Sequence, residues 1–303
     1  MGKIGGILLA GGKGTRLYPN TKIINKHLMP IYDKPMIFYS LSIFMLSKIR
    51  DITIVCNPSD ETAYKKLLGN GKQFGINITY SRQEQPDGIP DAINSAQIIS
   101  KYEKFMVVLG DNFLYGRDFY NILYSNIENH LNAAIYYQKV KDPSPYGIIK
   151  WENKKVIDLI EKPTEHVSND AVIGLYIFDN KFSNYFDNLK KSGRNEYEIV
   201  DIIKSYGLDK VTSNYIGRGT AWFDMGSSED FFNSSQFVKT IQDRQGLLVC
   251  SPHEIAFRNN WIGLEEIKNY LKEVDGSEYA ENLSKTLETV SYTHLRAHET
   301  RGN

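Results

Sequence analysis

The sequence has few cysteines, no net charge and no long apolar run, and each absence narrows the class of protein. The two cysteines, Cys56 and Cys250, lie in apolar stretches, which is typical of buried thiols in a reducing compartment and predicts a cytoplasmic location. Basic and acidic residues balance at 36 each, so no overall field attracts nucleic acid or an acidic membrane. No apolar run approaches the roughly 20 residues that span a bilayer, and the first residues are too short and glycine-rich for a signal peptide.

Internal repeats, low-complexity tracts and flexible linkers are also missing, whereas apolar residues make up 41% of the chain, enough for a large core. Through the first half, short apolar runs alternate with helical patterns. This alternation predicts a largely parallel sheet that is covered on both faces. The expected strands are 52–56, 76–80, 105–109 and 133–138, and the expected helices are 36–48, 60–68, 90–101 and 117–129.

The pattern changes after residue 140. A hairpin is expected at 147–152 and 155–160, and a buried strand at 171–179 mixes antiparallel pairing into the sheet. Helices dominate from 227 onward, at 228–244, 263–273 and 277–289. We therefore expect one domain over 1–290, with a nucleotide-binding half (3–130), a sugar-binding half (131–226) and a helical assembly region (227–290).

The last residues read SYTHLRAHETRGN. His294 and His298 have the helical i, i+4 spacing of half a metal site, but this polar, arginine-rich terminus offers no third ligand nearby. The string also resembles translated sequencing-adapter read-through. We expect 291–303 to be a non-native or disordered tail and exclude it from the fold.

A glycine-rich, basic loop directly follows the first apolar run. Residues 11–16 read GGKGTR, and Lys22 and Lys26 follow. Glycines let backbone N–H groups approach a ligand closely, and several such groups facing one way bind anions. A tight turn that happens to be rich in glycine is the alternative, but the added arginine and lysine favour a polyphosphate ligand.

Neither common phosphate motif fits this loop. The Walker A pattern needs Ser or Thr after Gly-Lys and an earlier glycine, but Gly14 follows Lys13 and Ile7 occupies the early position. The dinucleotide pattern can start at Gly12, but Leu17 replaces its third glycine. This failure counts against a nicotinamide-dependent oxidoreductase and indicates a phosphate loop of another kind.

Carboxylates stand where divalent cations are commonly held. Asp111 follows the apolar run FMVVLG, and Asp224 follows the aromatic run AWF. Either alone would be interpreted as a helix cap, but two of them beside glycine, in a chain with a polyphosphate loop, favour Mg²⁺ ligation. Glu161 and Lys162 end the second hairpin strand before Pro163, either as a solvated ion pair or as two side chains that point into a cleft.

These segments resemble, in order, the motifs of sugar-phosphate nucleotidyltransferases, and most closely those of the short bacterial glucose-1-phosphate thymidylyltransferase family. The resemblance covers roughly residues 3–290. Its most specific part is the block from QFVKT to EIAFR, because longer relatives end in a β-helix that this chain lacks. The resemblance implies a three-layer, Rossmann-like α/β fold with a mixed, mostly parallel central sheet and C-terminal helices. The similar segments are LLAGGKGTRLYP, HLMPIYDKPMIFY, VVLGDNFLYG, YGIIKW, EKP, AVIGLYIFD, RGTAWFDMG and QFVKTIQDRQGLLVCSPHEIAFR.

Members of this family join a nucleoside triphosphate to a sugar 1-phosphate and release pyrophosphate. The sugar phosphate oxygen attacks the α-phosphorus in line, so no protein nucleophile is needed, and the chain shows no activated serine or cysteine motif. Catalysis is then positioning and charge neutralisation. The resemblance implies Mg²⁺-dependent transfer from dTTP to α-D-glucose 1-phosphate, giving dTDP-glucose, the first step toward dTDP-rhamnose and other deoxysugars.

The resemblance also assigns residues to roles. The catalytic cations are Arg16 on the departing pyrophosphate, Lys26 on the phosphates and Lys162 on the sugar phosphate. The Mg²⁺ ligands are Asp111 and Asp224. The nucleotide-binding residues are Gly11, Gly12, Gly14, Thr15, Arg16, Gln83, Gly88 and Asp111, with Gln83 and Gly88 on the base. The sugar-phosphate pocket is Tyr146, Gly147, Glu161, Lys162 and Gly174.

A homotetramer with a feedback site at a subunit interface, built by the C-terminal helices, is a further implication of the resemblance. Tyr120 stands where a histidine is common in the family. The positions that match this site are Tyr115, Gly116, Glu254, Ile255 and Arg258.

Some positions depart from the family pattern. They are Pro90 after the base segment, where the family usually has alanine, Ile173 in the sugar-facing strand and Met225 after the second metal aspartate. At Asp91, in the same base segment, the family usually has an amide or an acid. A uridylyl- or cytidylyltransferase acting on another hexose 1-phosphate therefore stays open as an alternative. A catalytically inactive regulatory subunit would be expected to lose a metal aspartate or the basic loop residues, and this chain keeps them.

Overall fold

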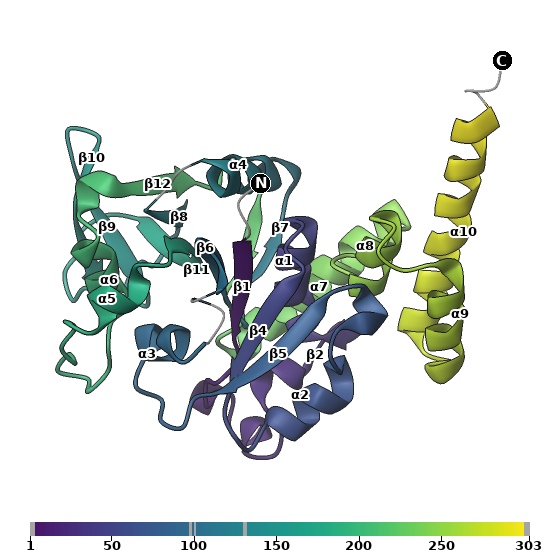
Figure 1. Ribbon diagram of the computed structural model, residues 1–303, viewed down its shortest axis with the longest axis horizontal. Helices are drawn as coiled ribbons and strands as arrows, with labels where there is room; N and C mark the ends of the chain where they lie inside the picture. Colours follow the sequence, from purple (N-terminus) through teal and green to yellow (C-terminus); the bar gives the residue numbers. More distant parts are fainter. Residues whose placement is uncertain (1–3, 97–98, 100, 130–131, 300–303) are drawn as a thin grey trace.

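A nine-stranded mixed sheet runs through the centre of the molecule (Figure 1). Its strands are Ile4–Leu9 (β1), Asp51–Cys56 (β4), Asn77–Arg82 (β5), Lys104–Leu109 (β6), Ala133–Lys139 (β8), Gly147–Glu152 (β9), Lys155–Glu161 (β10), Asp170–Asp179 (β11) and Val211–Tyr215 (β12). The main order is β10-β9-β11-β6-β1-β4-β5, with β8 between β11 and β12. Strands β6, β1, β4 and β5 are parallel, while β11 is antiparallel to β6 and β8. The computed structural model describes residues 4–96, 99, 101–129 and 132–299, and side chains in these ranges except 117–118 and 289–299.

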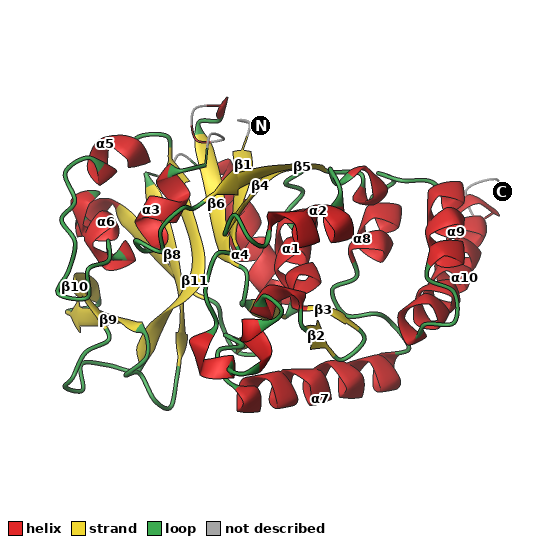
Figure 2. Ribbon diagram, turned by 90° about the horizontal axis from the view of Figure 1, so that it is seen from below, coloured by secondary structure: helices red, strands yellow, loops and turns green. Residues whose placement is uncertain are grey.

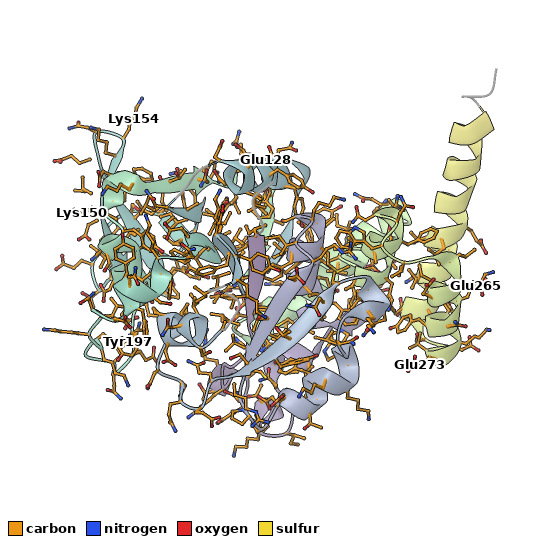
Figure 3. All side chains as sticks on the ribbon, viewed as in Figure 1. Glu128, Lys150, Lys154, Tyr197, Glu265 and Glu273 are labelled. Carbon is orange, nitrogen blue, oxygen red and sulfur yellow. The ribbon has the colours of Figure 1, made fainter. Side chains whose placement is uncertain are left out.

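Helices cover both faces of the sheet, because strands such as β1 carry apolar side chains on both faces. The side chains of β1 alternate, so Leu8 packs into the core on one face while Ile7 and Leu9 pack into the core on the other. The first face is covered by Met36–Leu46 (α1), Glu61–Leu68 (α2), Arg117–Glu128 (α4) and Pro252–Arg258 (α8). The second face is covered by Ile89–Asn94 (α3), Phe182–Phe186 (α5) and Ile199–Ser205 (α6). This confirms the α/β fold with helices on both sides, and Figure 3 shows side chains filling the space between the layers.

Two small sheets and the C-terminal helices complete the structure. Strands Pro30–Ile31 (β2) and Lys34–Pro35 (β3) pair with each other, as do Phe113–Tyr115 (β7) and Ala221–Phe223 (β13). Helix Ser228–Gln245 (α7) packs beside the small sheet of β7 and β13, because Val238 of α7 shares a third core cluster with Phe113 and Met225. Leu264–Glu273 (α9) and Glu278–Glu299 (α10) stand side by side at one end of the molecule (Figure 2).

The predicted elements are largely present, with some different limits. Helix α3 begins with Pro90 in its first turn, as predicted, but ends at Asn94 instead of 101. The carbonyl of Ser95 accepts a hydrogen bond from Ser81 Oγ of β5 (2.8 Å), so it is occupied by a partner outside the helix. Helix α10 continues to Glu299, so the backbone of 291–299 is helical where a disordered tail was expected. The non-native origin of that tail stays a prediction.

The two cysteines are free thiols. Cys56 is fully buried at the end of β4, and burial raises its pKa to about 12. Cys250 is less buried, and burial likewise raises its pKa to about 12. Both thiols are therefore protonated near neutral pH and are not nucleophiles.

Candidate active site

The glycine loop leaves the sheet at the end of β1, which lies between β6 and β4. Ala10 N–H still donates to Val55 O of β4 (2.7 Å), and the chain then turns away over residues 11–14. Gly14 adopts a left-handed φ of 61°, and its carbonyl accepts a hydrogen bond from Thr21 Oγ1 (2.7 Å). Gly12, Thr15 and Arg16 are exposed. The loop is thus fixed at its ends and open to solvent along its middle, as an anion-binding loop requires.

A buried polar network supports this loop from below. His27 Nδ1 lies 2.8 Å from Asn25 Oδ1 and 3.2 Å from the Tyr64 hydroxyl, which donates to Ala10 O (3.1 Å). Burial, helped by the charge of Lys26, lowers the pKa of His27 to about 3. His27 is therefore neutral and structural, and no local sequence pattern indicated it. The network fixes the segment that carries Lys26.

Lys26 and Asp111 form an ion pair at the edge of the sheet. Asp111 Oδ1 also accepts a hydrogen bond from Asn112 Nδ2 (3.0 Å). Burial alone would raise the pKa of Asp111, but the charge of Lys26 and the hydrogen bonds from Lys26 and Asn112 lower it overall. Two of the predicted phosphate and metal residues, which are far apart in the sequence, therefore meet in space.

Asp224 follows β13 and faces the same region. Burial raises its pKa, and the nearby charges of Asp230 and Asp111 raise it further, while Tyr146 and Arg16 oppose them. The Arg16 guanidinium lies against Gly226, where an added Cβ would be 2.7 Å from Arg16 Nη2. The glycine loop therefore reaches the second predicted metal ligand, and Asp224 carries a negative charge that its surroundings leave incompletely balanced.

The hairpin end brings Glu161 and Lys162 into this region. Lys162 has a positive φ of 45°, and its N–H donates to Tyr146 O (2.9 Å). Its Nζ lies 3.8 Å from Glu161 Oε1, which Arg194 Nη2 approaches at 3.4 Å. Burial raises the pKa of Glu161, while Lys162 and Arg194 lower it. Gly147 faces Glu161 closely, since a Cβ there would be 3.2 Å from Glu161 Oε2.

Asn112 connects the predicted metal ligand Asp111 to Gly174, which is predicted to contact the sugar phosphate. It is buried, accepts from Trp222 Nε1 (2.6 Å) and from Gly174 N–H (3.3 Å), and donates to Asp111. An added Cβ at Gly174 would lie 2.4 Å from Asn112 Nδ2, so this position has room only for glycine. The Trp222 ring packs on Tyr146 at 5.2 Å. Asn112 was missed although it directly follows Asp111; Trp222 and Arg194 carried no local signal.

A cavity of about 240 Å³ opens between the glycine loop and α3. Gln83 Nε2 donates to Gly88 O (3.2 Å) and to Asp91 Oδ2 (3.0 Å). Gly88 has a φ of 108°, and a Cβ there would be 2.2 Å from Tyr197 O, so no side chain fits. Of the residues assigned by resemblance, the cavity is lined by Gly11, Gly12, Lys26, Gln83, Gly88 and Asp111.

The predicted feedback residues lie together at a different place. A cavity of about 730 Å³ between β7, α4 and α8 is lined by Tyr120 and by all five residues predicted for that site. Arg258 Nε donates to Glu254 Oε1 there (2.7 Å). The lining of this cavity thus includes Tyr115, Gly116, Glu254, Ile255 and Arg258.

Comparison with known proteins gives consistent matches over nearly the whole chain. The nucleotidyl transferase family model matches residues 5–241. The chain is 38% identical over 284 residues to a glucose-1-phosphate thymidylyltransferase of Neisseria meningitidis serogroup A, covering 93% of this chain and 99% of that protein. It is 42% identical over 282 residues to the protein of the same name in Xanthomonas campestris pv. campestris, covering 92% and 95%.

Solved structures agree with the sequence matches. A crystal structure described as a glucose-1-phosphate thymidylyltransferase of Bacillus anthracis, in complex with a sucrose, superposes with a TM-score of 0.71 at 34% identity, covering 77% of this chain and 94% of that one. A UDP-glucose pyrophosphorylase complexed with UDP-glucose has a TM-score of 0.68 at 24% identity, covering 79% and 99%. The second likeness is one of fold alone.

Proposed function

Since the chain belongs to the nucleotidyl transferase family, we propose that it is an Mg²⁺-dependent glucose-1-phosphate thymidylyltransferase. It transfers a thymidylyl group from dTTP to α-D-glucose 1-phosphate, giving dTDP-glucose and pyrophosphate. The observation that supports this best is the meeting of Lys26 with Asp111 and of Arg16 with the Asp224 segment. Charges of both signs meet where a polyphosphate and a cation would have to bind together.

The reaction needs positioning and charge neutralisation. An oxygen of the sugar phosphate forms a bond to the α-phosphorus of dTTP, and the bond from that phosphorus to the β-phosphate oxygen breaks. Arg16 and Lys26 balance the charge that develops on the departing pyrophosphate, and Lys162 holds the sugar phosphate. Lys26 is already held by its ion pair with Asp111, so this cation needs little reorganisation when the charge moves.

The two aspartates fit a divalent cation. Oxygen ligands suit Mg²⁺, which usually takes one or two protein carboxylates and completes its shell with water and phosphate oxygens. Within the described residues no group of three or more His, Cys, Asp or Glu is arranged around a metal position. The raised pKa of Asp224 indicates a charge that a cation would balance. When bound, Mg²⁺ supplies charge neutralisation and orients the phosphates.

The sugar pocket lies between the hairpin and β11. In this proposal Tyr146, Gly147 and Glu161 contact the sugar from the hairpin side, and Gly174, which packs on Asn112, contacts it from β11. Glu161 can accept hydrogen bonds from sugar hydroxyls, since its carboxylate already has cationic neighbours. The two glycines let Asn112 and Glu161 pack closely against the backbone.

We further propose a cytoplasmic homotetramer in which the 730 Å³ cavity is the feedback site at a subunit interface. The product is the first intermediate toward dTDP-rhamnose and other deoxysugars. Neither nucleic acid nor a membrane is a partner in this proposal. In the part of the chain that the structure describes, no helix has the length and apolar character for crossing a bilayer.

The decisive experiment measures pyrophosphate release with glucose 1-phosphate and dTTP, UTP or CTP at equal concentration. We expect dTTP to be used best, UTP more slowly and CTP poorly. Thymine differs from uracil by one methyl group, and burying it is worth about 0.8 kcal/mol, or a roughly fourfold preference for dTTP over UTP. Any larger preference must come from discrimination against the 2′-hydroxyl of the UTP ribose. A tenfold preference for UTP or CTP would leave only the broader class, and no release with any nucleotide would indicate an inactive regulatory subunit.

A further inference from the structure

We infer that Asp91 is a positioning residue that fixes the amide of Gln83 so that its carbonyl oxygen faces the nucleotide. The site thereby favours a base with an N–H donor at N3. The inference rests on the proposed role of Gln83 in reading the base.

The partners of Gln83 determine which end of its amide faces which way. One end lies 3.0 Å from Asp91 Oδ2 and 3.2 Å from Gly88 O. A carboxylate oxygen and a backbone carbonyl oxygen both accept hydrogen bonds and cannot donate. The end between them must therefore be the NH₂ group, and both of its hydrogens are used.

The opposite end faces the cavity. A Cβ built on Gly11 would lie 3.2 Å from Gln83 Oε1, and Gly11 and Gln83 both line the 240 Å³ cavity. Gln83 is only 9% exposed, so its amide is largely enclosed by protein apart from the cavity. Turning the amide by half a rotation would place Oε1 against two acceptors, which leaves buried polar groups unpaired. Gly88 O alone would favour the same orientation, and Asp91 makes it strongly favoured.

A fixed carbonyl reads one property of a base. Thymine and uracil carry N3–H, which donates to Gln83 Oε1, whereas cytosine presents an N3 lone pair that repels it. A site built around a buried acceptor rejects a base without the matching donor, because the acceptor would stay unpaired. Asp91 thus acts on selection against cytosine and is neutral between thymine and uracil.

The test compares kcat/KM for dTTP, UTP and CTP in the wild type, Asp91→Asn and Asp91→Leu. Asparagine can donate to a turned Gln83 carbonyl, and leucine offers no partner, so both loosen the amide. We expect the dTTP-to-CTP ratio to fall by about tenfold or more in both variants, with the dTTP-to-UTP ratio unchanged. The matched control is Asp87→Asn in the same loop, because Asp87 Oδ1 pairs with Lys191 Nζ (2.8 Å) and no hydrogen bond joins it to Gln83 within the described residues.

Two results would overturn the inference. One is an unchanged dTTP-to-CTP ratio in both Asp91 variants. The other is a parallel loss with all three nucleotides, which would mean that Asp91 only supports the fold of the loop. If the wild type releases no pyrophosphate, the proposed function fails, and calorimetric dissociation constants for the three nucleotides with MgCl₂ still test Asp91 by the same ratios.

Discussion

Replacing Asp224 by asparagine should remove most activity and at the same time stabilise the metal-free protein. Burial, Asp230 and Asp111 all disfavour the negative charge of Asp224. The asparagine amide has the same shape as the carboxylate but no charge. Stabilising substitutions of this kind raise the free energy of unfolding by about 0.5–2 kcal/mol. In a chain of this size each kcal/mol raises the Tm by about 2 °C. Losing one preorganised electrostatic group costs about 10²–10³ in rate, or about 2.7–4 kcal/mol of barrier.

Asp111→Asn should be compared with Asp224→Asn, because the two variants should change stability in opposite directions. The activity of Asp111→Asn should fall by a similar factor, but its stability should fall too, because Lys26 loses the carboxylate that it pairs with. Asp230→Asn is the matched control: Asp230 Oδ2 accepts from Ser227 N–H (2.9 Å) in the capping box of α7. Asparagine keeps one oxygen that can accept this bond, so the stability should change by at most about 1 kcal/mol, with near-normal activity.

The assays are pyrophosphate release at saturating Mg²⁺ and thermal unfolding with and without the metal. Binding of Mg²⁺ to the folded state should raise the Tm of the wild type more than that of Asp224→Asn. Near-wild-type turnover of the Asp224 variant would refute its assignment as a ligand. A Tm below that of the wild type in metal-free buffer would refute the argument that its charge is unfavourable.

Three further predictions concern other parts of the molecule. Lys162→Met should raise KM for glucose 1-phosphate much more than KM for dTTP, since a charge-assisted contact to one phosphate is lost; equal rises in steady-state kinetics would place Lys162 on the triphosphate instead. Burial lowers the pKa of His253 to about 3, against 6.5 in the unfolded chain, so stability should be lost as pH falls below 6.5. Urea unfolding of wild type and His253→Phe, which keeps a ring against Tyr270, should differ in slope by up to about 1.4 kcal/mol per pH unit; parallel curves would contradict the assignment. Arg258→Gln should reduce inhibition by dTDP-rhamnose at least severalfold with basal turnover retained, and light scattering of either protein should report a tetramer; a monomer, or a wild type indifferent to dTDP-rhamnose, would remove the interface proposal.

Local strings of residues account for what the sequence predicts well. The glycine loop and Asp111 follow apolar strands directly, and both lie at the sheet edge as expected, since parallel strands end at a common edge. The contact of Trp222 with Asn112 joins residues 110 positions apart, and no local pattern indicates which distant side chain completes a buried hydrogen bond. Strand β12, with the sequence VTSNY, was missed because it is short and polar. Its sequence alone does not indicate a strand, and the strand forms through its parallel pairing with β8.

Helix limits show the same division between local and distant causes. The pattern of α7 predicted 228–244, and the helix spans Ser228–Gln245, because Ser227 caps its start within the local sequence. The predicted end of α3 was wrong by several residues; where the helix ends, the carbonyl of Ser95 accepts a hydrogen bond from Ser81 on another element, a contact that no local pattern indicates. Which side chains converge on the site could be expected only from the family resemblance, and their individual roles stay predictions.

The ion pair between Lys26 and Asp111 means that the free protein carries its own counter-ion. A bare divalent cation has to compete with an ammonium group for Asp111 and should gain little from binding alone. A triphosphate that arrives with its cation gives Lys26 an anionic partner and Asp111 a cationic one, so both exchange partners in a single event. Nucleotide and metal should then each strengthen the binding of the other by the same factor, as linkage requires.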